Sequence, residues 1–274
     1  MKKFLKIITI GAILIFAGIG FFLTAGFLAI NTGLTNDGGL PDNKLVTVDL
    51  TKKPTIPTQT DYIWDKDAEW QALVGGIEKD ALLIDQVSKQ TGVPTRLIVS
   101  QLVVEQLRLF HSEREVFKRY FGPLKILGNQ TMFSWGVLGF KEDTARQVEG
   151  NLKDKTSDFY LGSRYENILD FKTADIDSER FDRLTNEKDH YYSYLYGALY
   201  IKQIITQWQK AGFNIANQPA IIATLFNIGF ANSQPKSNPQ IGGSEIDIGD
   251  TKISFGELAS QFYYSDELIE YFPR

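Results

Sequence analysis

The segment 93–107 constrains the fold most, because it is apolar almost throughout and yet contains a glutamate. Glu105 shares one helix face with three apolar residues, at i, i+4, i+7 and i+11 spacing: Ile98, Leu102 and Leu109. This pattern predicts a buried helix, and burial disfavours the charged form of a carboxylate. We therefore expect Glu105 to be able to donate a proton near neutral pH, as the general acid of a glycosidase does.

A structural role is the competing interpretation of Glu105. Two arginines, Arg96 and Arg108, are close enough in sequence to form an ion pair with it. Ion-pair networks perturb proton affinities as catalytic sites do. Taken alone, the helix favours this structural interpretation.

Two later segments change that balance. Residues 133–145 read Phe-Ser-Trp-Gly-Val-Leu-Gly-Phe-Lys-Glu-Asp-Thr-Ala, and residues 221–229 read Ile-Ile-Ala-Thr-Leu-Phe-Asn-Ile-Gly. In this order after Glu105, they resemble the goose-type lysozyme and soluble lytic transglycosylase family. That family has a catalytic Glu at the end of an apolar helix, a Ser-x-Gly loop leading to Thr-Ala, and a later helix with Ala-Tyr-Asn-x-Gly. The resemblance spans residues 93–229.

The resemblance implies a mainly α-helical, lysozyme-like domain and gives roles to individual residues. Glu105 would be the general acid, and Ser134 and Gly136 would line the loop beside it. Phe226 and Asn227 would bind substrate. Asn227 would face the sugar next to the cleaved bond and hydrogen-bond its acetamido group or the Glu itself.

Tyrosines complete the expected binding cleft. The family has a cleft tyrosine near the end of the domain, and Tyr263 and Tyr264 are the candidates, of which we take Tyr264. Tyr192 lies at the start of the helix predicted over 191–211, where it would stack on sugar rings. Aromatic residues along such a helix more often belong to the core.

Three positions depart from the family pattern. Gln106 stands where Ser is usual, Gly139 where Gln is usual, and Phe226 where Tyr is usual. Each loses or changes a polar group near the expected cleft. The alternative function is therefore a catalytically degraded lysozyme-like module that binds glycan or serves as a scaffold in a cell-envelope machine. A third interpretation is a helical, membrane-tethered interaction protein whose motif matches are accidental.

The carboxylates predict which reaction an active site would catalyse. Glycosidases that hydrolyse their substrate usually need two carboxylates, and the nearby ones, Glu113, Glu142 and Asp143, are poorly placed in the sequence to be the second. Lytic transglycosylases, by resemblance, need one Glu to cleave the bond between N-acetylmuramic acid and N-acetylglucosamine. It protonates the glycosidic oxygen and then takes the proton from the muramyl C6 hydroxyl, which closes a 1,6-anhydro ring. We therefore expect a peptidoglycan lytic transglycosylase.

The N-terminal region predicts attachment to a membrane. Residues 7–30 contain no charge and are long enough to span a bilayer. Lysines within residues 1–6 place that end in the cytoplasm by the positive-inside rule, with residues 61–274 outside as the lysozyme-like domain. Residues 31–60, rich in Thr, Asn, Gly and Pro, would be a tether. A cleaved signal peptide is the alternative, but its apolar region should be shorter.

Composition removes other classes of function. The net charge of −4 offers no basic surface for nucleic acid. With no cysteine and only two histidines, the chain predicts no metal centre and no cofactor. The expected partners are peptidoglycan glycan strands, the membrane and an envelope complex. Alternating residues around Gly249-Asp250 add a small β-hairpin within 242–254, followed by a last helix over 255–272.

Overall fold

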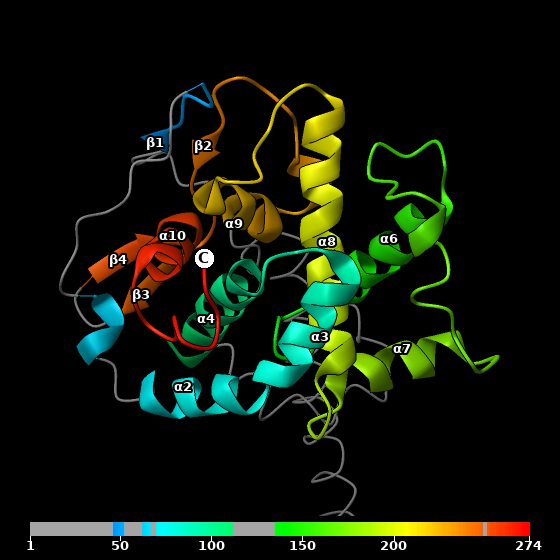
Figure 1. The fold of residues 1–274 in the computed structure, drawn as a ribbon, viewed down its shortest axis with the longest axis horizontal. Helices are drawn as coiled ribbons and strands as arrows, with labels where there is room; N and C mark the ends of the chain where they lie inside the picture. Colours follow the sequence, from blue (N-terminus) through cyan, green and yellow to red (C-terminus); the bar gives the residue numbers. More distant parts are fainter. Residues whose placement is uncertain (1–45, 52–61, 67–69, 112–134, 249–250) are drawn as a thin grey trace, which may run out of the picture. The chain divides into compact units, whose positions relative to one another are not determined.

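The computed structural model describes residues 46–51, 62–66, 70–111, 135–248 and 251–274 (Figure 1). The predicted membrane segment, residues 7–30, lies outside these ranges, as does Ser134. Within these ranges, no helix combines the length and the apolarity that a membrane crossing requires.

The described residues are mainly helical with a small antiparallel hairpin, which confirms these two parts of the predicted fold class. The α-helices among them are α2 (Trp70–Lys79), α3 (Ala81–Thr91), α4 (Thr95–His111), α6 (Glu142–Lys153), α7 (Ile176–Thr185), α8 (Tyr191–Lys210), α9 (Pro219–Ile228) and α10 (Phe255–Tyr264). The strands are β1 (Val46–Thr47), β2 (Gln240–Ile241), β3 (Glu245–Ile248) and β4 (Thr251–Ser254). In the described ranges, short 3-10 helices cover Ile63–Lys66, Ser163–Tyr165 and Phe230–Asn232.

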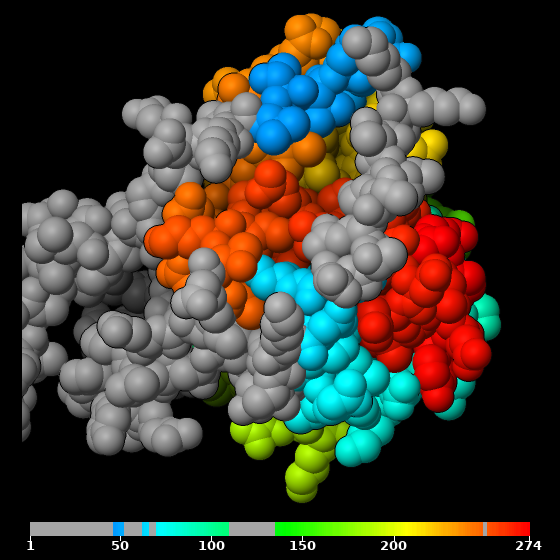
Figure 2. Space-filling view, turned by 90° about the vertical axis from the view of Figure 1, so that its left-hand side faces the viewer, coloured from blue at the N-terminus to red at the C-terminus, as the bar shows by residue number. Residues whose placement is uncertain are grey.

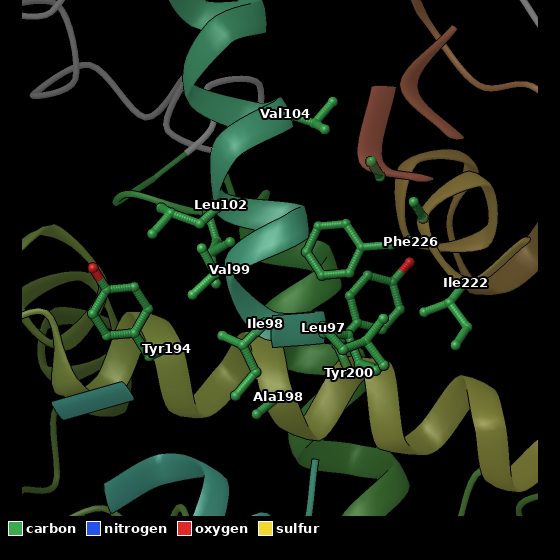
Figure 3. Packing of buried hydrophobic residues seen from close by; sticks show 14 of the residues in the cluster. Leu97, Ile98, Val99, Leu102, Val104, Tyr194, Ala198, Tyr200, Ile222 and Phe226 are labelled. Atoms are coloured by element: carbon green, nitrogen blue, oxygen red, sulfur yellow. The ribbon is translucent and has the colours of Figure 1, made fainter. Parts of the chain in front are cut away.

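Helix α4 is the central helix of this arrangement. Residues 96–105 are all buried, so α4 has no solvent-facing side over nearly three turns. It contacts α3, α8, α9, α10 and strand β3, and Figure 3 shows its side chains packing toward α8 and α9. Burying each large apolar side chain contributes about 1.5–3 kcal/mol, so packing around α4 is a main source of stability. The predicted burial of this helix is confirmed.

The apolar residues of 70–91 repeat at helical spacing, which predicts a helical segment that ends at Thr91-Gly92. This stretch forms two helices rather than one. The break falls at Asp80, between α2 and α3. The Asp80 carboxylate accepts hydrogen bonds from the ring of His190 and the hydroxyl of Tyr194, each at 2.6 Å. Asp80 thus joins the α2–α3 corner to the start of α8. The predicted end of α3 is confirmed, because Gly92 caps it with φ 74°.

Two small sheets both include strands from residues 240–254. Strand β1, within the segment predicted as a tether, pairs antiparallel with β2, with Val46 opposite Ile241. Strands β3 and β4 form the predicted hairpin, with Ile246 opposite Ile253. Ser254 then begins α10 with a capping box, in which its hydroxyl and the Glu257 side chain each accept from the other's backbone N–H. Helix α10 ends at Tyr264, earlier than the predicted boundary at 272.

A buried arginine holds the C-terminal segment against α4. The Arg96 guanidinium is fully buried and donates to the backbone carbonyls of Phe262, Tyr263, Ser265, Glu267 and Phe272. It also lies 4.6 Å from the ring centroid of Phe262, which packs edge-on against Trp64 and Trp70. Figure 2 shows the C-terminal residues, in red, beside the cyan residues of α2 on this face. Arg96 is therefore occupied by the C-terminal segment and not by Glu105.

Helices α6, α7 and α8 are joined by a second set of charged side chains. Arg180 of α7 forms two hydrogen bonds with Glu149 of α6, at 2.6 and 2.7 Å, and Tyr196 of α8 donates to the same carboxylate. Asp177 accepts from Arg180 and from Arg146 of α6. Helix α7 lies in the region 151–189, whose polar composition predicts a segment that wraps the surface without indicating a helix.

Candidate functional site

Glu105 lies within the last two turns of α4, and its side chain is buried. The residue is 4% exposed, yet its carboxylate has a partner of opposite charge. The Arg108 guanidinium, three residues later on the same helix, donates from Nη2 to Oε1 and from Nε to Oε2, the latter at 3.2 Å. The i, i+3 spacing makes such a pair, and both side chains are nearly excluded from solvent. The ion pair considered as the structural interpretation is therefore present.

The second motif forms a tight loop beside this pair. Trp135 and Phe140 exchange backbone hydrogen bonds at 2.5 and 2.9 Å, which closes residues 135–140 into a turn. The Gln106 side-chain amide donates to the carbonyl of Val137 in that turn. Gln106, one of the three departures from the family pattern, thus attaches the loop to α4.

Gly139 of this loop lies directly against the Glu105 carboxylate. Its φ of 60° is in the left-handed region, which favours glycine. A Cβ atom at this position would lie 1.8 Å from Oε1 of Glu105 and 2.6 Å from its carboxyl carbon. A residue with a side chain does not fit at position 139 while Glu105 keeps this conformation. Gly139, the second departure, therefore forms one wall of the site.

Aromatic rings connect the loop to the third motif. The ring of Phe140 lies 6.0 Å from that of Phe226 on α9, and Phe226 lies 4.9 Å from Tyr200 on α8. Figure 3 shows Tyr200 and Phe226 next to each other beside α4. The Tyr200 hydroxyl is buried, and no described residue is its hydrogen-bond partner; burial raises the pKa of this phenol. Phe226, predicted to bind substrate, is a residue of the aromatic core.

Asn227 is half-buried at the end of α9 and orders the chain before the hairpin. Its Oδ1 accepts from the backbone N–H of Ser244 at 2.8 Å and from the Ser244 hydroxyl at 3.0 Å. No described residue accepts a hydrogen bond from its Nδ2. Strand β3, which begins at Glu245, packs against α4. Asn227 thus holds the hairpin that contacts the Glu105 helix.

The remaining predicted site residues make their contacts elsewhere. Gly136 packs against the carbonyl of Leu184 and the hydroxyl of Ser193, at the junction of α7 and α8. The Tyr192 ring lies 4.4 Å from the Arg183 guanidinium. Tyr264 ends α10, where its ring packs on Tyr263 and its carbonyl accepts from Arg274. The structure therefore brings Glu105 together with the loop of the second motif, but shows no contact between Glu105 and these three residues.

Other carboxylates add no partner for Glu105 in the part of the chain that the structure describes. The sequence places Glu142 and Asp143 at the start of a helix that would face solvent. Glu142 does begin α6, but it is buried and paired with Arg146. Glu113 lies outside the described residues. Within them, no group of three or more histidine, aspartate or glutamate side chains could hold a metal ion.

Sequence reasoning weighed Arg108 but missed the contacts of Gln106 and Gly139. The sequence did contain a signal for these contacts. Gln106 and Gly139 both depart from the family pattern, and they lie in two segments that contact each other. Departures paired in this way indicate a changed contact. Comparison of the chain with protein-family models, with curated proteins and with solved structures finds no match to any of them.

Proposed function

We propose that this chain is a membrane-anchored peptidoglycan lytic transglycosylase, with Glu105 as its single general acid and base. The observation that carries the proposal is the contact between Glu105 and Gly139. It joins a buried carboxylate at the end of an apolar helix to the Gly-Val-Leu-Gly loop that follows it by some 30 residues. This pairing of helix and loop is what the resemblance to the goose-type lysozyme and transglycosylase family leads us to expect.

The reaction requires Glu105 to hold a proton when the glycan binds. The protonated carboxyl donates it to the glycosidic oxygen between N-acetylmuramic acid and N-acetylglucosamine, and the C1–O bond breaks. The substrate's acetamido group stabilises the cationic centre, and the Asn227 Nδ2 is a donor available to that group. The carboxylate then takes the proton of the muramyl C6 hydroxyl as O6 bonds to C1. The proton returns to Glu105, and no water is consumed.

A second candidate function is a glycan-binding or scaffold module without catalysis. The Arg108 ion pair favours it, because the guanidinium already occupies both oxygens of the carboxylate that would have to act on the substrate. For catalysis, Glu105 must carry a proton at this position when substrate binds.

The products formed from purified sacculi distinguish these functions. The full chain in detergent micelles should release muropeptides that end in 1,6-anhydromuramic acid, which mass spectrometry separates from hydrolysis products by one water. Glu105→Gln should lower turnover by at least about 100-fold, since it cannot transfer a proton.

Glu149→Gln is the matched control for that substitution. Glu149 also has two hydrogen bonds with a buried arginine, Arg180, but it lies on α6. Its substitution should reproduce any loss of stability and leave turnover per folded molecule unchanged. Binding of sacculi with no released product would support the scaffold, and products with ordinary reducing ends would show hydrolysis.

The anchor has its own test. We propose that residues 7–30 cross the cytoplasmic membrane and place residues 61–274 outside. Protease added to intact spheroplasts should then degrade the C-terminal part and leave the N-terminus protected. Protection of the whole chain from external protease contradicts this topology.

A further inference from the structure

We propose that Gly139 is a positioning residue for Glu105: the absence of a side chain at 139 lets the carboxylate rest in its ion pair with Arg108, and a side chain there displaces it. The predicted loss of stability follows from the geometry alone, whereas the predicted loss of catalytic activity rests on the proposed function.

The first step is steric. A Cβ at position 139 would lie 1.8, 2.6 and 3.0 Å from three successive atoms of the Glu105 side chain, Oε1, the carboxyl carbon and Cγ. These distances are shorter than van der Waals contact, and they extend along the end of the side chain. The smallest substitution, alanine, therefore cannot coexist with the observed conformation.

The second step is that the loop cannot easily move away. Trp135 and Phe140 are paired through two backbone hydrogen bonds, and both side chains are buried. The Trp135 ring packs edge-on against Phe181 at 5.2 Å, and Gln106 holds the carbonyl of Val137. With the loop held at both ends and at its tip, the clash is relieved by movement of Glu105.

The third step is what that movement costs. Glu105 is buried, so a displaced carboxylate loses its two hydrogen bonds with the Arg108 guanidinium while it remains in a poorly solvated place. Gly139→Ala should therefore destabilise the chain beyond the ordinary cost of a left-handed alanine. This additional loss requires the Glu105 carboxylate and disappears without it.

A thermal double-mutant cycle on the full chain tests this. Gly92→Ala is the control, because Gly92 has a similar φ of 74° and a Cβ there would meet only the mobile end of Lys202, at 3.7 Å. Gly139→Ala should lower the melting temperature clearly more than Gly92→Ala. In the Glu105→Ala background, the two substitutions should lower it equally. Two results overturn the proposal. In one, Gly139→Ala still lowers the melting temperature more than Gly92→Ala in the Glu105→Ala background. In the other, the two substitutions already have equal effects in the wild-type background.

Kinetic measurements on sacculi add a second test, because a purely structural role of Gly139 would leave kcat per folded molecule unchanged. With Glu105 displaced, Gly139→Ala should lower kcat by about 100-fold, the cost of misplacing a reacting group by about 1 Å, and leave KM nearly unchanged. Gly92→Ala should alter neither constant. A fall in kcat that matches the control contradicts the positioning role. If the wild type has no activity, the proposed function fails, and the thermal cycle still decides whether Gly139 positions Glu105.

Discussion

Glu105 and Arg108 form a buried ion pair one helical turn apart, at the end of the central helix of the described fold. This pair changes the expectation for Glu105→Gln. Burial alone predicts that a neutral amide is well tolerated there, whereas the pair predicts that the amide weakens the contact with the Arg108 guanidinium and so lowers stability. Activity must therefore be compared per folded molecule.

Arg108 provides the first prediction. Arg108→Ala should lower the free energy of unfolding by about 3–5 kcal/mol, because it leaves the Glu105 carboxylate buried without its cation. Denaturant titration measures this. The control is Lys89→Ala, which removes an exposed i, i+4 pair with Asp85 and should cost less than about 0.5 kcal/mol. Equal effects at the two sites would mean that burial adds nothing to the Glu105 pair.

The second prediction concerns Arg96 and the C-terminal segment. Arg96→Lys should destabilise by several kcal/mol, since a lysine has three donors on a point charge and cannot reproduce a planar fork among five carbonyls. Hydrogen exchange should accelerate first in residues 262–272. Desolvation lowers the pKa of Arg96 to about 10, so the guanidinium is still charged at neutral pH. Arg274→Ala, which removes an exposed arginine from the same segment, should have a much smaller effect.

The third prediction concerns Asn227 and separates the role of its side-chain oxygen from that of its amide nitrogen. Asn227→Ala removes the acceptor of two hydrogen bonds from Ser244 and should cost about 1–3 kcal/mol. Asn227→Asp keeps the acceptor oxygen, so stability should remain near that of the wild type. If the amide nitrogen contacts substrate, both variants should lose turnover. Normal turnover of Asn227→Asp would restrict Asn227 to ordering the hairpin.

Asp177 provides a pH-dependent prediction. The hydrogen bond from Arg180 holds the pKa of the Asp177 carboxyl below its ordinary value of 3.8. A group whose folded pKa is lowered stabilises the fold above its unfolded pKa, and this contribution disappears as the pH falls through the folded pKa. Asp177→Asn should therefore be less stable than the wild type at pH 7, and the difference should disappear as the pH falls from the ordinary pKa of 3.8 through the lowered pKa of the folded state. A constant difference across this range would exclude the ionised carboxylate as its source.

Much of the helical layout could be predicted from the sequence. Residues Tyr191–Lys210 and Pro219–Ile228 are helices because their apolar periodicity is long and their ends carry recognisable signals. The break at Asp80 could not be predicted, because it depends on His190 and Tyr194, more than 100 residues away. Helix α7 was missed for the same reason, since its buried arginines are balanced by partners on other elements.

The candidate site was predictable in its segments but not in its contacts. The order of the motifs around Glu105 and Gly139 indicated that helix and loop would meet, and they do. Which arginine pairs with Glu105 could not be read from spacing, because Arg96 and Arg108 were both near. The choice depends on the C-terminal carbonyls that occupy Arg96, and these come together only in three dimensions.

The hydrogen bonds between Arg96 and the C-terminal carbonyls also bear on when the native packing of α4 can be completed. Residues that meet at this guanidinium are up to 176 positions apart in sequence. Until residues 262–272 have been synthesised, α4 contains a cation whose acceptors do not yet exist, and its apolar faces lack α10. Contacts of such long range slow folding. During synthesis, we therefore expect α4 to reach its native packing only after residues 262–272 have emerged, and to expose apolar surface until then.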